Sequence, residues 1–182
     1  MRHALLVSFA LVLFAGVAWA GPGSVGIFGD PAGTKCNLPD SGPQTTMYYV
    51  VHVNTTGAMA VAYTASKPTC STATWLADNN VFTVTIGNSQ TGVAMGYGTC
   101  LVGSFHVQTI VYFTDGLTPN CCKYPVLKHP GEGRIAAVDC NQNYWIPDPT
   151  GGVGIIRPLP HCNCDVPAED TTWGRVKSLY SE

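Results

Sequence analysis

The 182-residue chain has little charge: only 11% of its residues are Asp, Glu, Lys or Arg, against about 25% in an average soluble protein. Nine Lys and Arg face eleven Asp and Glu, so there is no basic excess to attract nucleic acid. With 46% hydrophobic residues the chain is too apolar to be disordered. Its 20 Gly and 13 Pro exclude a coiled coil or a helical repeat. The length suits a domain with its own core.

The sequence also lacks the motifs of common enzymes. It has no G-x-S-x-G, no phosphate-binding glycine loop and no H-E-x-x-H. His52 and His106 lie on predicted strands and could hold a metal if paired across a sheet, although strand histidines are more often half-buried and hydrogen-bonded. Asp139, Asp148 and Glu132 could supply paired carboxylates for sugar hydrolysis, but nothing fixes their separation. We therefore predict a non-enzymatic protein with no catalytic, cofactor-binding or metal-binding residues and no cofactor.

Long hydrophobic runs are missing except at the N-terminus. Met1-Arg2-His3 is a short positive start, and an apolar run follows over Ala4–Phe14. Ala18-Trp19-Ala20 then places small residues at the two positions that a signal peptidase reads. We predict a signal peptide over residues 1–20 and a secreted protein, extracellular, periplasmic or at the cell surface, with no transmembrane segment after cleavage. The alternative is an uncleaved membrane anchor.

Eight cysteines follow the predicted signal peptide: Cys36, Cys70, Cys100, Cys121, Cys122, Cys140, Cys162 and Cys164. An even number in an exported chain predicts a disulfide framework, whose pairing the sequence leaves open. Cys121 and Cys122 should bond different partners, because successive side chains of a strand point to opposite faces. Cys162 and Cys164 could also reach two separate partners. Zinc ligation is the alternative, but His161-Cys162-Asn163-Cys164 and Cys121-Cys122 with His129 lack the C-x2-4-C spacing of structural zinc sites.

Short strand-like segments separated by turns dominate the remaining sequence. They predict an all-β, two-sheet β-sandwich, immunoglobulin-like or similar and stapled by disulfides, over residues 21–165; a barrel is the alternative. Turns are expected between the strands, as at Asn54-Thr55-Thr56-Gly57. Val81–Ile86 alternates, with Phe82, Val84 and Ile86 on one face. The expected strands are Ser24–Phe28, Thr46–Val53, Ala58–Thr64, Val81–Ile86, Gly92–Tyr97, Phe105–Phe113, Tyr124–Leu127, Arg134–Cys140, Tyr144–Ile146 and Val153–Ile156.

The tail over residues 166–182 predicts a short amphipathic helix. Trp173, Val176 and Tyr180 are spaced i, i+3, i+7 on one face, with Leu179 beside them. So short a helix is not stable alone. We therefore expect this apolar stripe to dock either on the parent sheet or on a protein or surface partner.

The same tail carries a resemblance. Thr171-Thr172-Trp173-Gly174-Arg175-Val176-Lys177-Ser178-Leu179-Tyr180 resembles the TTWGxVKxLY endings of exported bacterial Cys-rich proteins of unknown function. Such proteins share further segments with this chain: Gly87-Asn88-Ser89-Gln90-Thr91-Gly92, Cys121-Cys122-x-Tyr124-Pro125, Val138-Asp139-Cys140 and Cys162-x-Cys164. The resemblance implies a bacterial, exported origin and no particular activity.

Two classes of function remain. The first is a secreted or cell-surface structural or interaction module. The second is an extracellular module that binds carbohydrate or another ligand, with sugar rings stacking on exposed aromatic side chains. The candidates for such stacking are Trp75, Tyr97, Tyr112, Tyr144 and Trp145, whose commoner role would be to fill the core.

Overall fold

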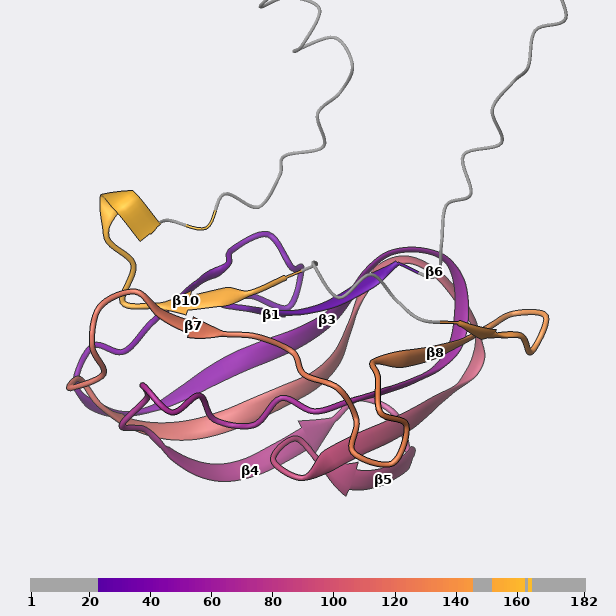
Figure 1. Ribbon diagram of the computed structural model, residues 1–182, viewed down its shortest axis with the longest axis horizontal. Coiled ribbons are helices and arrows are strands. Elements are labelled where there is room, and N and C mark those ends of the chain that lie inside the picture. The colour runs from indigo at the N-terminus through magenta and orange to yellow at the C-terminus, as the bar shows by residue number, and fades with distance from the viewer. Residues whose placement is uncertain (1–22, 146–151, 163, 165–182) are drawn as a thin grey trace, which may run out of the picture.

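The protein is described by a computed structural model of residues 23–145, 152–162 and 164 (Figure 1). The predicted signal peptide, residues 1–20, and the tail over residues 166–182 lie outside these residues. Within them, no helix is long and apolar enough to span a membrane. The described residues form the strands β1 Ser24–Phe28, β2 Asn37–Leu38, β3 Pro43–Tyr63, β4 Thr74–Asn80, β5 Val84–Asn88, β6 Gly92–Asp115, β7 Cys122–Tyr124, β8 Ala136–Asp139, β9 Tyr144–Trp145 and β10 Gly154–Ile156, and the 3-10 turn Pro160–Cys162.

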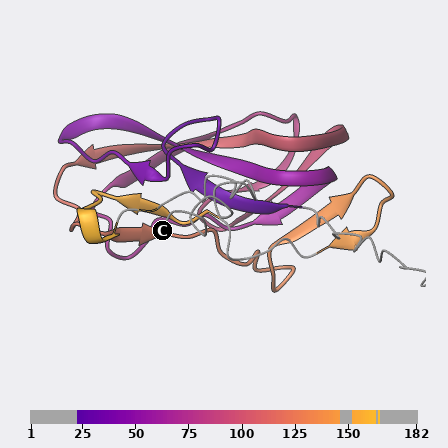
Figure 2. The same cartoon turned by 90° about the horizontal axis from the view of Figure 1, so that it is seen from above.

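Two sheets make up the fold. The larger sheet has the order β4-β6-β3-β8-β9, with β1 also paired to β3 and β5 also paired to β6. The smaller sheet has the order β2-β10-β7. Figure 2 shows the long strands in one layer and β7 and β10 beneath them. The predicted all-β two-sheet sandwich is confirmed.

The long strands β3 and β6 replace four shorter strands of the prediction. Thr46–Val53 and Ala58–Thr64 belong to one strand, because the expected turn between them is a series of register irregularities in the β3–β6 pairing. Asn54 (φ 52°) and Gly57 (φ 154°) take the unusual backbone angles that these irregularities require. The polar residues of this segment therefore bend the strand, and the chain does not reverse its direction here. The predicted turn at this position is wrong.

The alternation predicted over Val81–Ile86 holds only in part. The strand β5 begins at Val84, and the preceding residues form a bend. Phe82 turns inward, with its ring centroid 4.6 Å from that of Tyr97. Val84 and Ile86 face solvent. The bend thus separates Phe82 from the face that the other two share.

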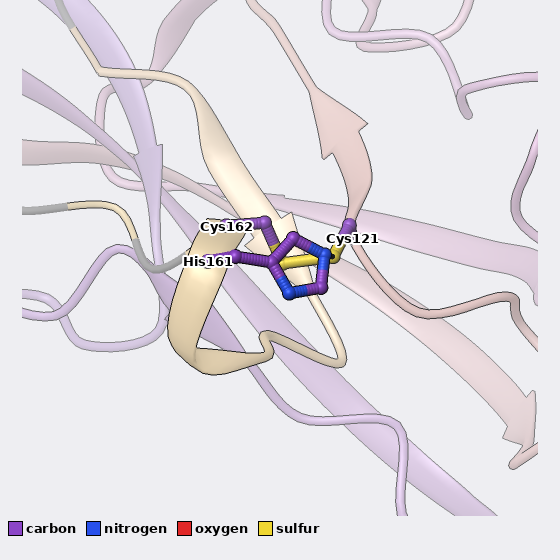
Figure 3. A group of neighbouring side chains, drawn as sticks. All are labelled: Cys121, His161 and Cys162. Carbon is purple, nitrogen blue, oxygen red and sulfur yellow. Dashed lines mark hydrogen bonds between the residues drawn. A yellow bond between two sulfur atoms is a disulfide. The ribbon is translucent and has the colours of Figure 1, made fainter.

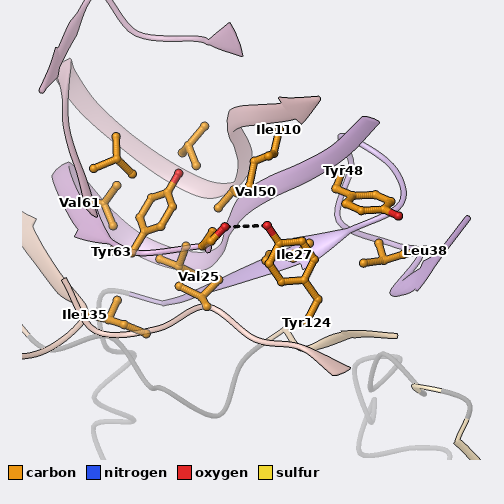
Figure 4. Packing of buried hydrophobic residues seen from close by; sticks show 14 of the residues in the cluster. Val25, Ile27, Leu38, Tyr48, Val50, Val61, Tyr63, Ile110, Tyr124 and Ile135 are labelled. Atoms are coloured by element: carbon orange, nitrogen blue, oxygen red, sulfur yellow. Dashed lines mark hydrogen bonds between the residues drawn. The ribbon is translucent and has the colours of Figure 1, made fainter. Parts of the chain in front are cut away.

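A cluster of tyrosines forms much of the core between the sheets, where Figure 4 shows Tyr48, Tyr63 and Tyr124 among aliphatic side chains. Their hydroxyl groups are hydrogen-bonded, as burial requires. The hydroxyls of Tyr112 and Tyr124 lie 2.7 Å apart, and Tyr124 donates to the Ala65 carbonyl at 2.6 Å. Tyr63 donates to Oε1 of the buried Gln108 at 3.0 Å. The core is therefore tied together by hydrogen bonds as well as by apolar contact.

All eight cysteines are paired in disulfides: Cys36–Cys164, Cys70–Cys122, Cys100–Cys140 and Cys121–Cys162. Cys121 and Cys122 bond different partners, as predicted, and so do Cys162 and Cys164. Cys122 belongs to the core cluster, against which Cys70 also packs. The predicted disulfide framework is confirmed.

Candidate functional site

An apolar trough lies on the outer face of the larger sheet, at the end where β5, β6, β3, β8 and β9 pair side by side. One row of residues in register crosses these five strands: Val84, Gly96, Ala60, Val138 and Tyr144. The next row crosses four of them: Ile86, Ala94, Ala62 and Ala136. Residues paired directly across a sheet share a face. The trough has a volume of about 250 Å³.

Small residues form the floor of the trough and larger ones its walls. Ala60, Ala62, Ala94 and Gly96 leave the sheet backbone close to the surface. Val84 and Ile86 stand on β5 and are 62% and 76% exposed. These two are among the most exposed aliphatic side chains of the described residues. The half-buried floor and the exposed walls together form one contiguous apolar surface.

The strand alternation explains why this face is apolar. In β3, Val61 and Tyr63 point into the core, so Ala60 and Ala62 point outward. In β6, Met95 and Tyr97 point inward in the same way, which leaves Ala94 and Gly96 outside. An outer sheet face that water covers usually carries polar residues. Here both faces of the sheet are apolar.

The polar residues that line the trough, Glu132 and Tyr144, are hydrogen-bonded to each other at its β9 side. Tyr144 donates a hydrogen bond to Oε2 of Glu132 at 2.7 Å. This hydrogen bond raises the pKa of the Tyr144 hydroxyl above its usual value. The guanidinium carbon of Arg134 lies 4.8 Å from the centroid of the same ring. These contacts fix the orientation of Tyr144 as a wall of the trough.

The aromatic residues proposed to stack on sugars do not form one platform. Tyr97 and Tyr112 are buried in the core. Trp75 is on β4 and Tyr144 is on β9, which are the opposite ends of the strand order in the larger sheet. Trp145 pairs with Ala137 through the backbone. The stacking role predicted for Tyr97 and Tyr112 is therefore wrong, and core packing accounts for both.

The two histidines do not meet. His52 is fully buried on the inner face, where Nδ1 lies 2.9 Å from the hydroxyl of Tyr97. His106 lies on the outer face against the ring of Tyr49, and Nε2 is 3.0 Å from the Thr109 hydroxyl. Burial lowers the pKa of His106. A metal shared by the two imidazoles is excluded, because the sheet separates them.

The candidate carboxylates have structural contacts of their own. Asp139 accepts hydrogen bonds from the backbone amides of Asn141 at 2.9 Å and Asn143 at 2.7 Å, and so closes the turn between β8 and β9. Glu132 is bonded to Tyr144. Asp148 lies outside the described residues. The structure thus brings no paired carboxylates together among the described residues.

Cys121, His161 and Cys162 gather at the start of β7, and their side-chain donor atoms all lie within 4.8 Å of one another (Figure 3). Cys121 and Cys162 are joined in a disulfide. Nε2 of His161 lies 3.6 Å from the Cys121 sulfur. Zinc binds cysteines as thiolates. Because both sulfurs are used in the disulfide, this group is a disulfide with a histidine beside it and not a zinc site. Cys164 is bonded to Cys36, and His129 lies beside Gly92 and Gly131.

Trp173, Val176 and Tyr180, the residues of the predicted docking helix, lie outside the described residues. The trough itself was not predicted, because no charged or aromatic motif marks it. Its signal in the sequence is an apolar run on both faces of neighbouring strands, as in Ala58–Tyr63 and Gly92–Tyr97. Such a run is also typical of a buried strand.

No protein-family model matches the sequence, and no curated protein is similar to it. Among solved structures, the fold is similar to a non-cellulosomal cohesin from the hyperthermophilic archaeon Archaeoglobus fulgidus, with a TM-score of 0.50 and 11% identity over 76% of this chain and 93% of that one. This similarity shows the fold, which is a β-sandwich.

Two clostridial structures are similar at lower scores. One is the Coh-OlpC–Doc435 complex, a type I cohesin–dockerin complex from Clostridium thermocellum, with a TM-score of 0.46 and 8% identity over 76% of this chain and 97% of that one. The other is CaCohA2 from Clostridium acetobutylicum, with a TM-score of 0.41 and 8% identity over 76% and 92% of the two chains.

Proposed function

We propose that this protein is an exported, non-enzymatic interaction module that binds the apolar face of a helix from a partner protein in its trough. The observation that carries the proposal is the half-buried apolar floor formed by Ala60, Ala62, Ala94 and Gly96 between exposed aliphatic side chains on β5 and Tyr144 on β9. Four disulfides support export, because such bonds form and persist in oxidising compartments.

The width of the trough suits a helix. Four strand spacings separate β5 from β9, which makes about 19 Å between their backbones. A helix with its side chains is about 10–12 Å across. The Ala and Gly floor allows the helix to approach closely, while Val84 and Ile86 contact its flank. Apolar residues at i, i+3, i+4 and i+7 of the partner would cover the floor.

The chemistry of the trough favours a protein over a sugar. A carbohydrate site needs several polar groups that converge on the hydroxyls of the ligand. Here the side chains of Glu132 and Tyr144 are hydrogen-bonded to each other. The other residues that line the trough are Ala, Val, Ile, Met and Gly. No arrangement of the described aromatic side chains supports the carbohydrate alternative.

Photo-crosslinking from the wall of the trough tests this proposal. A benzophenone amino acid at position 86 is expected to form an adduct with a second, different protein in cells that export the full chain. Ala62→Arg places a long charged side chain on the floor and should reduce the adduct at least tenfold. Because Ala62 faces outward, the melting temperature of this variant should stay within a few degrees of the wild type.

Position 102 provides the matched control, since Val102 is 69% exposed on β6 and does not line the trough. A benzophenone there should give no such adduct. The proposal is wrong if position 86 labels no more than position 102, or if Ala62→Arg leaves the adduct unchanged. An adduct with twice the mass of this chain would show that the trough binds a second copy of the chain and not a different protein.

A further inference from the structure

A second apolar patch lies on the outer face of the larger sheet, at the opposite end of β3 and β6 from the trough. Met47 pairs with Val111, and the next outward row joins Thr45 to Phe113. Met47 is 47% exposed and Phe113 is 45% exposed. With Tyr49 and Val111 these residues form the outer patch, which is centred on the two longest strands.

The chain leaves the described residues beside this patch. Cys164 is bonded to Cys36, and it packs against the cluster of Phe28, Cys36 and Val51. Tyr49 packs against the same cluster. Cys164 is therefore held by a disulfide beside residues of the outer face of the larger sheet.

The outer patch continues the row of outward-facing residues that includes Val51 on β3. The loop after β1 already covers Val51: a Cβ atom at Gly33 would lie 3.0 Å from Cγ1 of that residue. The positive φ of Gly33, 71°, suits glycine and lets the loop lie this close. The neighbouring apolar side chains beyond Val51 on this face are those of Tyr49 and Met47.

The tail has the composition and the length to cover the patch. Trp173, Val176 and Tyr180 form the apolar stripe of the expected helix. Residues 165–169 span up to about 17 Å when extended. A helix over residues 170–180 is about 17 Å long. The patch extends about 13 Å along β3 from Tyr49 to Thr45, so both its nearest and its farthest rows are within reach.

We propose that the C-terminal segment, residues 170–180, docks on the outer patch of its own chain, with Trp173, Val176 and Tyr180 seated on Tyr49, Met47 and Phe113. The trough is a poorer site for this segment. The tail starts beside Val51, where Cys164 is held by its disulfide. From Val51, Met47 is four residues or about 13 Å away along β3, whereas Ala60 is nine residues or about 30 Å away in the other direction. The tail is then an integral cover of the sandwich.

Crosslinking from the tail of the full chain tests this placement. A benzophenone amino acid at position 176 should give an adduct within one chain that maps to the peptides containing Met47 or Phe113. Position 178, two residues further on, lies on the opposite side of the expected helix from the stripe and should label them at least fivefold less. Phe113→Glu should abolish the adduct from position 176. Ala62→Arg, which blocks the trough, should leave it unchanged, and this separates the result from the test of the trough.

Thermal stability gives a second readout. Trp173→Ala should lower the melting temperature by on the order of 10 °C, because a large side chain loses its buried contacts, whereas Ser178→Ala, on the opposite side of the helix, should change it by less than about 2 °C. Adducts from position 176 in the trough, adducts between two chains, or labelling no stronger than from position 178 would each overturn the proposal. An unchanged melting temperature in Trp173→Ala would contradict it too.

Discussion

Full reduction of the four disulfides is expected to unfold this domain at temperatures where the oxidised protein is folded. The bonds join residues 128, 52, 40 and 41 positions apart. In the chain-entropy model, closing a loop of about 128 residues stabilises a protein by about 5 kcal/mol, and closing one of about 40 residues by about 4 kcal/mol. The loops overlap, so these values do not add. Any two of them nevertheless rival the net stability of about 5–15 kcal/mol that a domain has.

Single bonds should differ in their effect in a predictable way. The Cys70–Cys122 bond packs against the core cluster, so Cys70→Ser with Cys122→Ser also places a hydroxyl among apolar neighbours. We expect this pair to lower the free energy of unfolding by more than Cys121→Ser with Cys162→Ser, because these two cysteines are half-buried and lie outside the core cluster. Denaturant unfolding followed by circular dichroism measures both. The second pair is the matched control, because its sequence separation is similar.

Intact mass checks the premise of this comparison. The oxidised chain should be lighter than the reduced chain by eight hydrogens, two for each of the four disulfides. Free thiols in the exported protein would contradict the pairing. A strand-rich circular dichroism spectrum and a cooperative melting transition in the fully reduced protein would show that the sandwich is stable without its staples.

The sequence predicts the chemistry of the fold better than its geometry. The cysteine count and the period-two segments are local features, and they are sufficient for a disulfide-stapled sandwich. Strand length depends on partners that are distant in sequence. Asn54 and Gly57 have turn propensity, yet β6 and β8 hold both sides of them in the sheet and turn them into an irregularity. The strand Thr74–Asn80 was not predicted because four of its seven residues are Ala, Asp or Asn, which are depleted in strands.

The trough was not predictable from its residues for a related reason. Alanine and glycine have no strong preference for either face of a sheet, so Ala60, Ala62 and Ala94 could equally have been core residues. Only the pairing of five strands shows that they lie in one exposed surface. For the aromatic candidates the sequence suggested a binding role that the structure does not show. Tyr97 and Tyr112 were candidates for stacking on a ligand, but both fill the core.

The tyrosine core should make the protein unfold steeply above pH 10. Burial raises the pKa of five phenols above the ordinary value of 10.0: those of Tyr48, Tyr63, Tyr97, Tyr112 and Tyr124. Each folded hydroxyl keeps its proton, while in the unfolded chain it ionises. The stability that these groups contribute is therefore complete below pH 10 and is lost as the pH rises from 10 towards the folded values.

The size of this effect is large because five groups act together. For each pH unit above 10, a phenol that stays protonated in the fold loses up to about 1.4 kcal/mol of stability relative to the unfolded chain. At pH 11 the four phenols with the strongly raised pKa values, those of Tyr48, Tyr63, Tyr97 and Tyr124, together lose about 6 kcal/mol, which is comparable to the whole stability of many domains. We expect unfolding between about pH 11 and pH 12.

Absorbance at 295 nm and far-ultraviolet circular dichroism, followed in one titration, measure this transition. The five buried phenols should ionise together, at the pH where the strand signal is lost, whereas exposed tyrosines should ionise earlier. Tyr124→Phe removes one titrating group but also the hydrogen bonds to Tyr112 and Ala65, so it should lower stability at pH 7 as well. Tyr144→Phe removes one exposed phenol whose pKa is raised mainly by its hydrogen bond to Glu132, so it should shift the midpoint less than Tyr124→Phe. Ionisation of all tyrosines while the strand signal persists would show that the core hydroxyls are accessible to hydroxide in the folded state.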